Sequence, residues 1–173
     1  MKAAIVMGSD SDLAIMKETV ETLDKFGVGS FVSITSAHRT PDKVKAFLDE
    51  AKNQGCEVII AAAGMAAHLA GVVAAHTTMP VIGVPLQAGS LDGLDALFAT
   101  VQMPGGIPVA TMAIGKAGAV NAAIFAVEIL AVKYPELKAK LEEQKKELAS
   151  GVEKKDKELR EKGIKKYMDD HKK

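Results

Sequence analysis

The sequence predicts an α/β fold in which a parallel sheet is covered by helices on both faces. Short apolar segments alternate along the chain with longer segments whose apolar residues recur every three or four positions, a pattern typical of βαβ units. Residues 58–63 are continuously apolar, as expected of a strand that is covered on both faces. With 173 residues, 48% of them hydrophobic and 25% charged, the chain is long enough to bury the core of one globular domain.

The elements of the first part of the chain begin and end at recognisable residues. In order, we expect a strand at 3–7, a helix at 13–26, a strand at 31–35 and a helix at 41–54. Gly27 and Gly55 end the two helices, since glycine adopts the left-handed conformation that often follows a helix. Thr40 and Pro41 provide an N-cap and a proline in the first helical position.

The alternation of strands and helices continues in the second part of the chain. We expect strands at 58–63, 81–84 and 109–114, and helices at 66–75, 93–101 and 121–132. The last helix is mostly apolar and rich in alanine, so it must be covered and allows close approach of a neighbour. We expect its surface from 119 to 132, with the Gly/Ala-rich loops, to be too extensive for one subunit to cover, which favours an oligomer.

Charge divides the chain into a body and a tail. Residues 1–135 contain 9 Lys or Arg and 12 Asp or Glu, whereas residues 136–173 contain 13 and 10. We therefore expect a single α/β catalytic domain at 1–135 and a charged helical extension at 136–173. The extension has a narrow apolar stripe and interleaved acidic residues, which favours packing on the body or on a second subunit over binding to nucleic acid.

Composition excludes several classes of partner. The chain has 22 basic and 22 acidic residues and few aromatic ones, so nothing favours nucleic-acid binding. No apolar stretch approaches the roughly 18 residues of a membrane helix, and the polar segment 9–12 follows the first strand too closely for a signal peptide. Cys56 is the only cysteine and has no disulfide partner within the chain. We expect a cytoplasmic protein.

Candidate ligand-binding residues lie where strands end, because ligands of open parallel sheets bind beyond the carboxyl ends of the strands. After the first strand, the segment 8–12 places short oxygen-bearing side chains at a helix start, where free amides favour an anion. Two acidic groups beside a phosphate would repel it, so we assign Asp12 to sugar hydroxyls, and Ser9 and the backbone amides to phosphate. The structural alternative is a simple helix cap.

The second strand ends in a hydroxyl, an imidazole and a guanidinium within four positions. Arg39 can hold a phosphate, and His38 can exchange a proton near neutral pH. Ser36 adds a hydroxyl to the same helix start. A lone loop histidine is more often structural, but the neighbouring anion site favours a catalytic role for His38.

The third strand is followed by a loop of small and apolar residues with one histidine, His68. This loop offers close backbone approach and a poorly hydrated space that suits a small, weakly polar group. The structural alternative is an ordinary tight turn with a hydrogen-bonded histidine. The residues expected to line this space are Gly64, Ala66, Ala67 and Leu69.

Several familiar motifs are missing from the sequence. It has no G-x-G-x-x-G loop and no phosphate-binding P-loop, which disfavours dinucleotide and nucleoside triphosphate chemistry. It also has no H-E-x-x-H cluster and no G-x-S-x-G turn. We therefore expect no metal ion and no covalent nucleophile.

Together the motifs strongly resemble the PurE family, the N5-carboxyaminoimidazole ribonucleotide mutases of de novo purine (IMP) biosynthesis. The resemblance covers residues 3 to about 134 and is carried by the segments 8–12, 36–41, 66–69, 83–85 with 91–95, and 102–109. It implies a three-layer flavodoxin-like fold and a homo-octamer with active sites at subunit contacts, with no metal or organic cofactor. The implied reaction moves a carboxylate from N5 to C4 of the substrate's imidazole, giving 4-carboxy-5-aminoimidazole ribonucleotide.

The resemblance also implies a role for each candidate residue. Ser9, Asp12 and Arg39 would bind the small-molecule ribonucleotide, with Ser11 and Ser36 supporting its phosphate. His38 would be the general acid and base. His68, with the loop 64–69, would hold the migrating carboxylate or carbon dioxide. Confinement would matter because free carbon dioxide escapes rapidly.

Two positions depart from the family, and two other functions stay open. Met65 stands where the family usually has glycine, and Ala70 where it usually has proline. A sister class (class II) carboxylates aminoimidazole ribonucleotide directly with carbon dioxide and typically has lysine after the first histidine and a Ser-Asn pair in the second loop. Arg39 and Ala67-His68 instead resemble the mutases. A non-catalytic nucleotide-binding module on the same fold is the other alternative.

Overall fold

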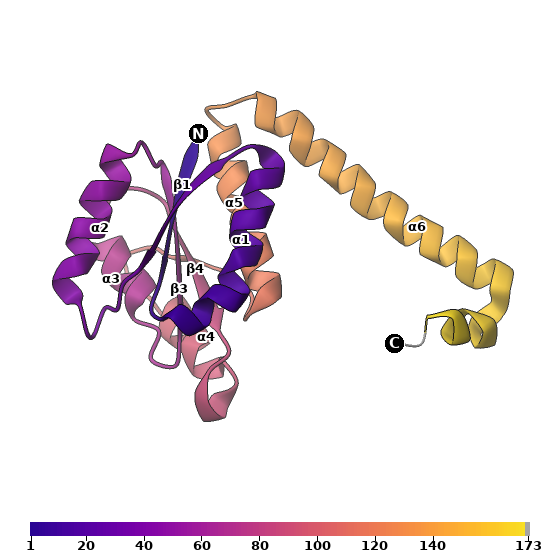
Figure 1. Cartoon of the computed structure of the whole chain (residues 1–173), viewed down its shortest axis with the longest axis horizontal. Helices are drawn as coiled ribbons and strands as arrows, with labels where there is room; N and C mark the ends of the chain where they lie inside the picture. Colours follow the sequence, from indigo (N-terminus) through magenta and orange to yellow (C-terminus); the bar gives the residue numbers. More distant parts are fainter. Residues whose placement is uncertain (172–173) are drawn as a thin grey trace.

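The computed structural model describes residues 1–171 as helices packed on both faces of a five-stranded parallel sheet, which confirms the predicted α/β class (Figure 1). The strands are β1 (Lys2–Met7), β2 (Gly29–Ile34), β3 (Val58–Gly64), β4 (Val81–Leu86) and β5 (Ala110–Thr111). The helices are α1 (Leu13–Phe26), α2 (Pro41–Asn53), α3 (Leu69–Ala75), α4 (Leu94–Val101), α5 (Lys116–Ala131) and α6 (Glu136–Asp170), with short 3-10 turns η1 (Asp10–Asp12) and η2 (Gly89–Leu91). The strand order β2-β1-β3-β4-β5 is that of a flavodoxin-like sheet.

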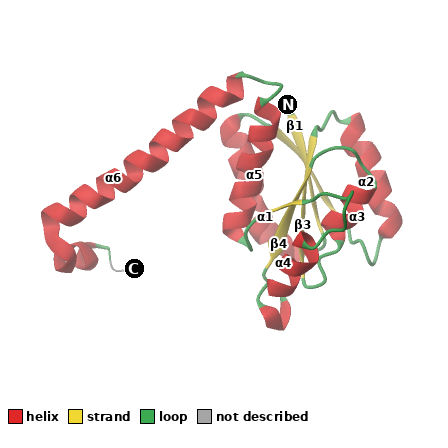
Figure 2. Cartoon of the chain, turned by 180° about the vertical axis from the view of Figure 1, so that it is seen from behind, coloured by secondary structure: helices red, strands yellow, loops and turns green. Residues whose placement is uncertain are grey.

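The centre of the sheet is apolar on both faces. Ile60 of β3 lies between Ile5 of β1 and Ile82 of β4 in the parallel register. These residues face α1 and α5, whereas their neighbours Ala4 and Ile59 belong to the core under α2 and α3. The two cores and the sheet between them form the three layers visible from behind in Figure 2.

Helix α5 is longer than predicted, and one of its faces is covered within its own chain. It begins at Lys116 rather than at 121, and one face of it is buried against the sheet and α1. The Thr19 hydroxyl of α1 donates a hydrogen bond of 2.9 Å to the Ala119 carbonyl oxygen, and Leu137 of α6 covers the same core. Alanine and glycine let α1 approach closely enough to bury this face, whereas Val132, just after the helix, is 85% exposed.

Three other predictions about where elements begin or end differ from the structure. The strand expected at 109–114 is reduced to β5, which pairs with β4 only through Ala110 and Thr111. The helix expected from residue 66 begins at Leu69, because residues 65–68 form a tight turn. The Thr40 side chain does not cap α2; its hydroxyl instead exchanges hydrogen bonds with the backbone of Ser36.

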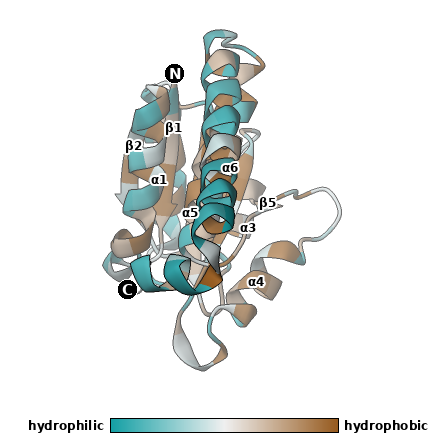
Figure 3. Cartoon of the chain, turned by 90° about the vertical axis from the view of Figure 1, so that its right-hand side faces the viewer, coloured by the Kyte–Doolittle hydropathy of each residue, from teal (hydrophilic) through white to brown (hydrophobic). Residues whose placement is uncertain are grey.

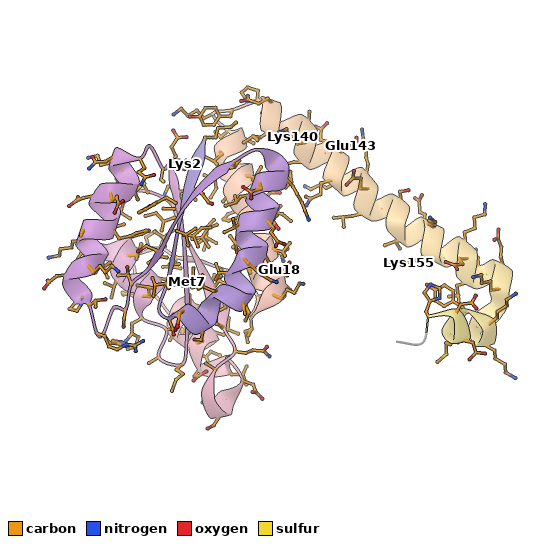
Figure 4. All side chains as sticks on the ribbon, in the orientation of Figure 1. Lys2, Met7, Glu18, Lys140, Glu143 and Lys155 are labelled. Atoms are coloured by element: carbon orange, nitrogen blue, oxygen red, sulfur yellow. The ribbon has the colours of Figure 1, made fainter. Side chains whose placement is uncertain are left out.

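Helix α6 packs on the body only at its start. Leu137 and Leu141 are buried, and the Lys140 ammonium donates a hydrogen bond of 2.7 Å to the Phe26 carbonyl oxygen. The helix then leaves the body, so that Lys140 lies beside α1 and Lys155 far from it in Figure 4. Its surface is mainly hydrophilic (Figure 3). At Gly163 the backbone turns, and residues 164–170 fold back.

None of the helices within residues 1–171 combines the length and the apolar character that a membrane-crossing segment requires.

Candidate active site

A pocket of about 510 Å³ lies where the loops after β1, β2 and β3 meet, at the carboxyl ends of the strands. Its lining residues are Gly8, Ser9, Ser11, Asp12, Ser36, Ala37, His38, Arg39, Ala63, Gly64, Met65, Ala66, His68, Leu69 and Ala88. Because β2, β1 and β3 are adjacent in the sheet, loops that are distant in sequence converge here.

The loop after β1 is organised by its own polar side chains. The Ser9 amide donates to the Asp12 carboxylate at 3.0 Å, as in a capping box, and the Ser11 amide donates to the Ser9 hydroxyl at 3.3 Å. The Ser11 hydroxyl donates to that of Ser9 at 3.0 Å. Capping and ligand binding are compatible, because Ser9, Ser11 and Asp12 also line the pocket.

The loop after β2 carries the pocket's guanidinium. The Ser36 hydroxyl accepts a hydrogen bond of 3.1 Å from the Arg39 amide, which fixes the turn that precedes α2. The Arg39 guanidinium reaches across to β1 and donates to the Gly8 carbonyl oxygen at 3.3 Å. This contact places a permanent positive charge beside the serine hydroxyls of the first loop.

The loop after β3 is tightly turned. The Ala67 amide donates to the Met65 carbonyl oxygen, and the His68 amide to that of Ala66, both at 2.8 Å. Each of these bonds joins residues only two positions apart, so the chain reverses within a few residues. Gly64 is needed before the turn, because a Cβ there would lie 2.7 Å from the Cβ of Ala88.

The second and third loops meet through their histidines. His38 Nε2 lies 2.8 Å from His68 Nδ1, and the two rings are nearly perpendicular, with an interplanar angle of 88°. At this distance one of the two nitrogens must carry the hydrogen that they share. The contact joins two groups that can each exchange a proton, and both imidazoles remain exposed to the pocket.

The pocket combines one carboxylate with one guanidinium. Partial burial raises the pKa of the Asp12 carboxyl, and the hydrogen bonds that it accepts from the Ser9 backbone and the Ser11 side chain offset this only in part. The folded protein therefore binds a proton at Asp12 more tightly than the unfolded chain does. The resulting stability is present below the ordinary aspartate pKa of about 3.9 and is lost as pH rises through the raised value.

Asp12→Asn is expected to make the folded protein more stable at pH 7 and to weaken its binding of the ribonucleotide. The amide keeps an oxygen for the Ser9 backbone but cannot ionise, so urea denaturation should show the variant to be more stable than the wild type at pH 7. This advantage should shrink as pH falls toward about 4. The same variant should raise the KM for a ribonucleotide by about 10-fold or more, because a charged acceptor for the sugar hydroxyls is lost. An unchanged KM would contradict the assignment of Asp12 to the ligand.

Most of the candidate residues lie at the surface of this one pocket. The exception is Ala67, whose side chain is buried beneath the loop and does not line it. The sequence reasoning missed Ala63 and Ala88, whereas Met65 belongs to the predicted loop 64–69. Ala88 could have been found from topology, since β4 lies next to β3 and its loop must border the same site. Among residues 1–171, no group of three or more His, Cys, Asp or Glu side chains is placed to hold a metal ion.

The chain is similar to known proteins over most of its length. A family model described as AIR carboxylase matches residues 2–151. The chain is 51% identical to the N5-carboxyaminoimidazole ribonucleotide mutase of Pyrococcus horikoshii, over 95% of this chain and 92% of that protein. It is 52% identical to the mutase of Escherichia coli K12, over 84% of this chain and 86% of that protein. The crystal structure of Treponema denticola PurE superposes with a TM-score of 0.83 at 26% identity, covering 91% of this chain and 98% of that one.

Proposed function

This chain belongs to the AIR carboxylase family, and on that premise we propose how its pocket transfers a carboxylate. The chain is an isomerase of purine biosynthesis, an N5-carboxyaminoimidazole ribonucleotide mutase. Its substrate carries a phosphate, a ribose and an aminoimidazole ring whose exocyclic nitrogen N5 bears the carboxylate. The pocket must therefore hold an anion at one end and carry out acid–base chemistry at the other.

The phosphate and the ribose are assigned to the first two loops. Arg39 supplies the positive charge, and the hydroxyls of Ser9, Ser11 and Ser36 supply hydrogen-bond donors around it. The contact between Arg39 and the Gly8 carbonyl oxygen supports this assignment, since it holds the guanidinium at the start of the first loop. Asp12 is assigned to the ribose hydroxyls, away from the phosphate that it would repel.

The carboxyl transfer is assigned to the two histidines. The bond between N5 and the carboxylate carbon breaks, carbon dioxide leaves, and the electron pair stays on N5, which takes a proton from His38. C4 of the ring then attacks carbon dioxide, and the proton on C4 returns to His38. Protons and electrons balance without another reactant. His68 orients the His38 ring and, with the small residues of the third loop, holds the carbon dioxide.

The contact between His38 and His68 is the observation that carries this proposal. It brings the group that must give and take a proton against the loop that must hold the carbon dioxide. A nucleotide-binding module needs the guanidinium and the hydroxyls, but binding alone does not require two imidazoles that share a hydrogen. The direct carboxylase would use a similar site, and the relatives named above favour the mutase.

The function can be tested by giving the purified chain the mutase substrate and the carboxylase substrates in separate assays. The purified chain should convert N5-carboxyaminoimidazole ribonucleotide to 4-carboxy-5-aminoimidazole ribonucleotide, with slow or no turnover of aminoimidazole ribonucleotide and bicarbonate at ordinary concentrations. Turnover of only the second pair would identify a direct carboxylase. Binding without turnover of either would identify a non-catalytic module.

A homo-octamer with active sites at subunit contacts is part of the proposal. Both imidazoles are exposed in the single chain, although the chemistry requires a confined site, and a neighbouring subunit would supply the missing cover. Apolar side chains on and just before α4 are exposed by half or more: Leu91 58%, Leu94 51%, Phe98 60% and Val101 50%. Light scattering should give a mass several times that of the chain, and a stable monomer would contradict shared sites.

The domain division and the cellular compartment are proposals as well. Residues 1–135 would form the catalytic domain and residues 136–173 the helical extension, of which 172–173 lie outside the described residues. A cytoplasmic location is supported by the role in purine biosynthesis and by Cys56, which is a buried free cysteine.

A further inference from the structure

The Thr40 hydroxyl joins the two ends of the turn between β2 and α2. It accepts a hydrogen bond of 3.0 Å from the Ser36 amide and donates one of 3.1 Å to the Ser36 carbonyl oxygen. The Thr40 amide donates to the same carbonyl oxygen at 2.9 Å. Three hydrogen bonds therefore close this turn, and both His38 and Arg39 lie within it.

The Thr40 hydroxyl has neither of the other roles open to it. Thr40 directly precedes Pro41, the first residue of α2, where a threonine hydroxyl usually accepts a hydrogen bond from an amide of the first helical turn. No such bond forms here. Thr40 is also not among the residues that line the pocket, although the four residues before it are. Its hydroxyl therefore acts on the turn itself.

His38 depends more on this closure than Arg39 does. The Arg39 amide donates to the Ser36 hydroxyl at 3.1 Å, and its guanidinium donates to the Gly8 carbonyl oxygen at 3.3 Å. The His38 ring, by contrast, has one hydrogen-bond partner within residues 1–171, the His68 Nδ1 at 2.8 Å. Because such bonds extend only to about 3.2 Å, a small shift of the turn would break this contact.

We propose that Thr40 is a positioning residue for His38, an inference that rests on the acid–base role proposed above. The hydroxyl fixes the turn, so that the imidazole stays within reach of His68 and of the reacting atoms N5 and C4. One imidazole must give a proton to the first atom and take one from the second, so both steps slow when it is misplaced. A displacement of about 1 Å can cost on the order of 10²-fold in rate.

A pair of substitutions at Thr40 isolates the hydroxyl. Thr40→Val replaces it with a methyl group of similar size and should lower kcat by about 10-fold or more, with a smaller effect on KM because Arg39 keeps its own contacts. Thr40→Ser retains the hydroxyl and should restore most of the rate. The matched control is Thr77→Val, which should keep full activity. The Thr77 hydroxyl also bonds within a turn, accepting from the Met79 amide at 3.1 Å, but it lies outside the pocket.

A double variant distinguishes positioning of His38 from a general structural defect. His38→Asn/Thr40→Val should have the same kcat as His38→Asn alone, because no imidazole is left for the hydroxyl to position. A defect that inactivated part of the protein would instead lower the residual rate of His38→Asn by the same factor as the wild-type rate. Should Thr40→Val fail to fold, Thr40→Ala removes the same hydroxyl and takes its place in both comparisons.

The outcomes separate this inference from the function on which it rests. It is overturned if Thr40→Val is as fast as the wild type, if Thr40→Ser is as slow as Thr40→Val, or if the effects of the two substitutions multiply in the double variant. In each of these cases a slow His38→Asn still supports the acid–base role of His38. If the wild type makes no product, or if His38→Asn keeps full activity, the proposed mechanism fails and this inference fails with it.

Discussion

His38→Asn should lower kcat for the mutase reaction by about 10²–10⁴-fold, the usual contribution of a positioned acid–base group. The amide of asparagine can occupy part of the space of the imidazole and can hydrogen-bond to His68, but it cannot transfer a proton to N5 or accept one from C4. KM should change little, because Arg39 and the serine hydroxyls still bind the phosphate. Steady-state kinetics with the N5-carboxylated substrate give both values.

A matched histidine outside the pocket provides the control. His76 is exposed at the end of α3, away from the residues that line the site, and His76→Asn should keep full activity. If His38→Asn were as active as His76→Asn, the acid–base role of His38 would be refuted. If both variants bound substrate and neither they nor the wild type turned it over, the chain would be a binding module.

The same kinetic experiment can test whether His38 and His68 act together. Because they share one hydrogen over 2.8 Å, their contributions should not be additive. The double variant His38→Asn/His68→Asn should be about as slow as His38→Asn alone. A double variant whose loss equals the product of the two single losses would show that the histidines act independently.

The substitution Gly118→Ala should have the second large effect, a loss of stability. This glycine is buried in the first turn of α5, and a Cβ there would overlap the Ala113 carbonyl oxygen, which is backbone and cannot rotate away. Gly118→Ala should therefore force α5 away from the loop that precedes it. We expect a loss of about 3 kcal/mol in the free energy of unfolding, or about 6–12 °C in melting temperature for a chain of this size.

Gly151→Ala is the control for this substitution. Gly151 lies within α6 at ordinary helical φ, and a Cβ there would meet nothing within 4 Å. The same chemical change should stabilise the protein by about 0.5–1 kcal/mol, because alanine favours the helix. If Gly118→Ala were also neutral or stabilising in urea denaturation, the close contact between α5 and the Ala113 carbonyl group would be refuted.

The strands, helices and turns that were predicted correctly depend on residues close together in sequence. The end of α1 at Gly27 is an example: the glycine has φ of +74° and its amide bonds back to the last turn, as the residue type alone suggested. The boundaries that were predicted wrongly depend on other segments. Helix α5 starts early because the loop before it packs on β4, where the Gly115 amide donates to the Pro85 carbonyl oxygen.

The sequence by itself determined the α/β class, the order of the elements and the loops that carry polar groups, because apolar periodicity, glycine and proline act through neighbouring residues. Only the tertiary structure decided that His38 meets His68, 30 residues away, and that Met65 adopts positive φ. It also decided that α1 covers α5, through a bond between residues 100 positions apart. Such contacts form when separate elements pack on one sheet, so no local pattern along the chain encodes them.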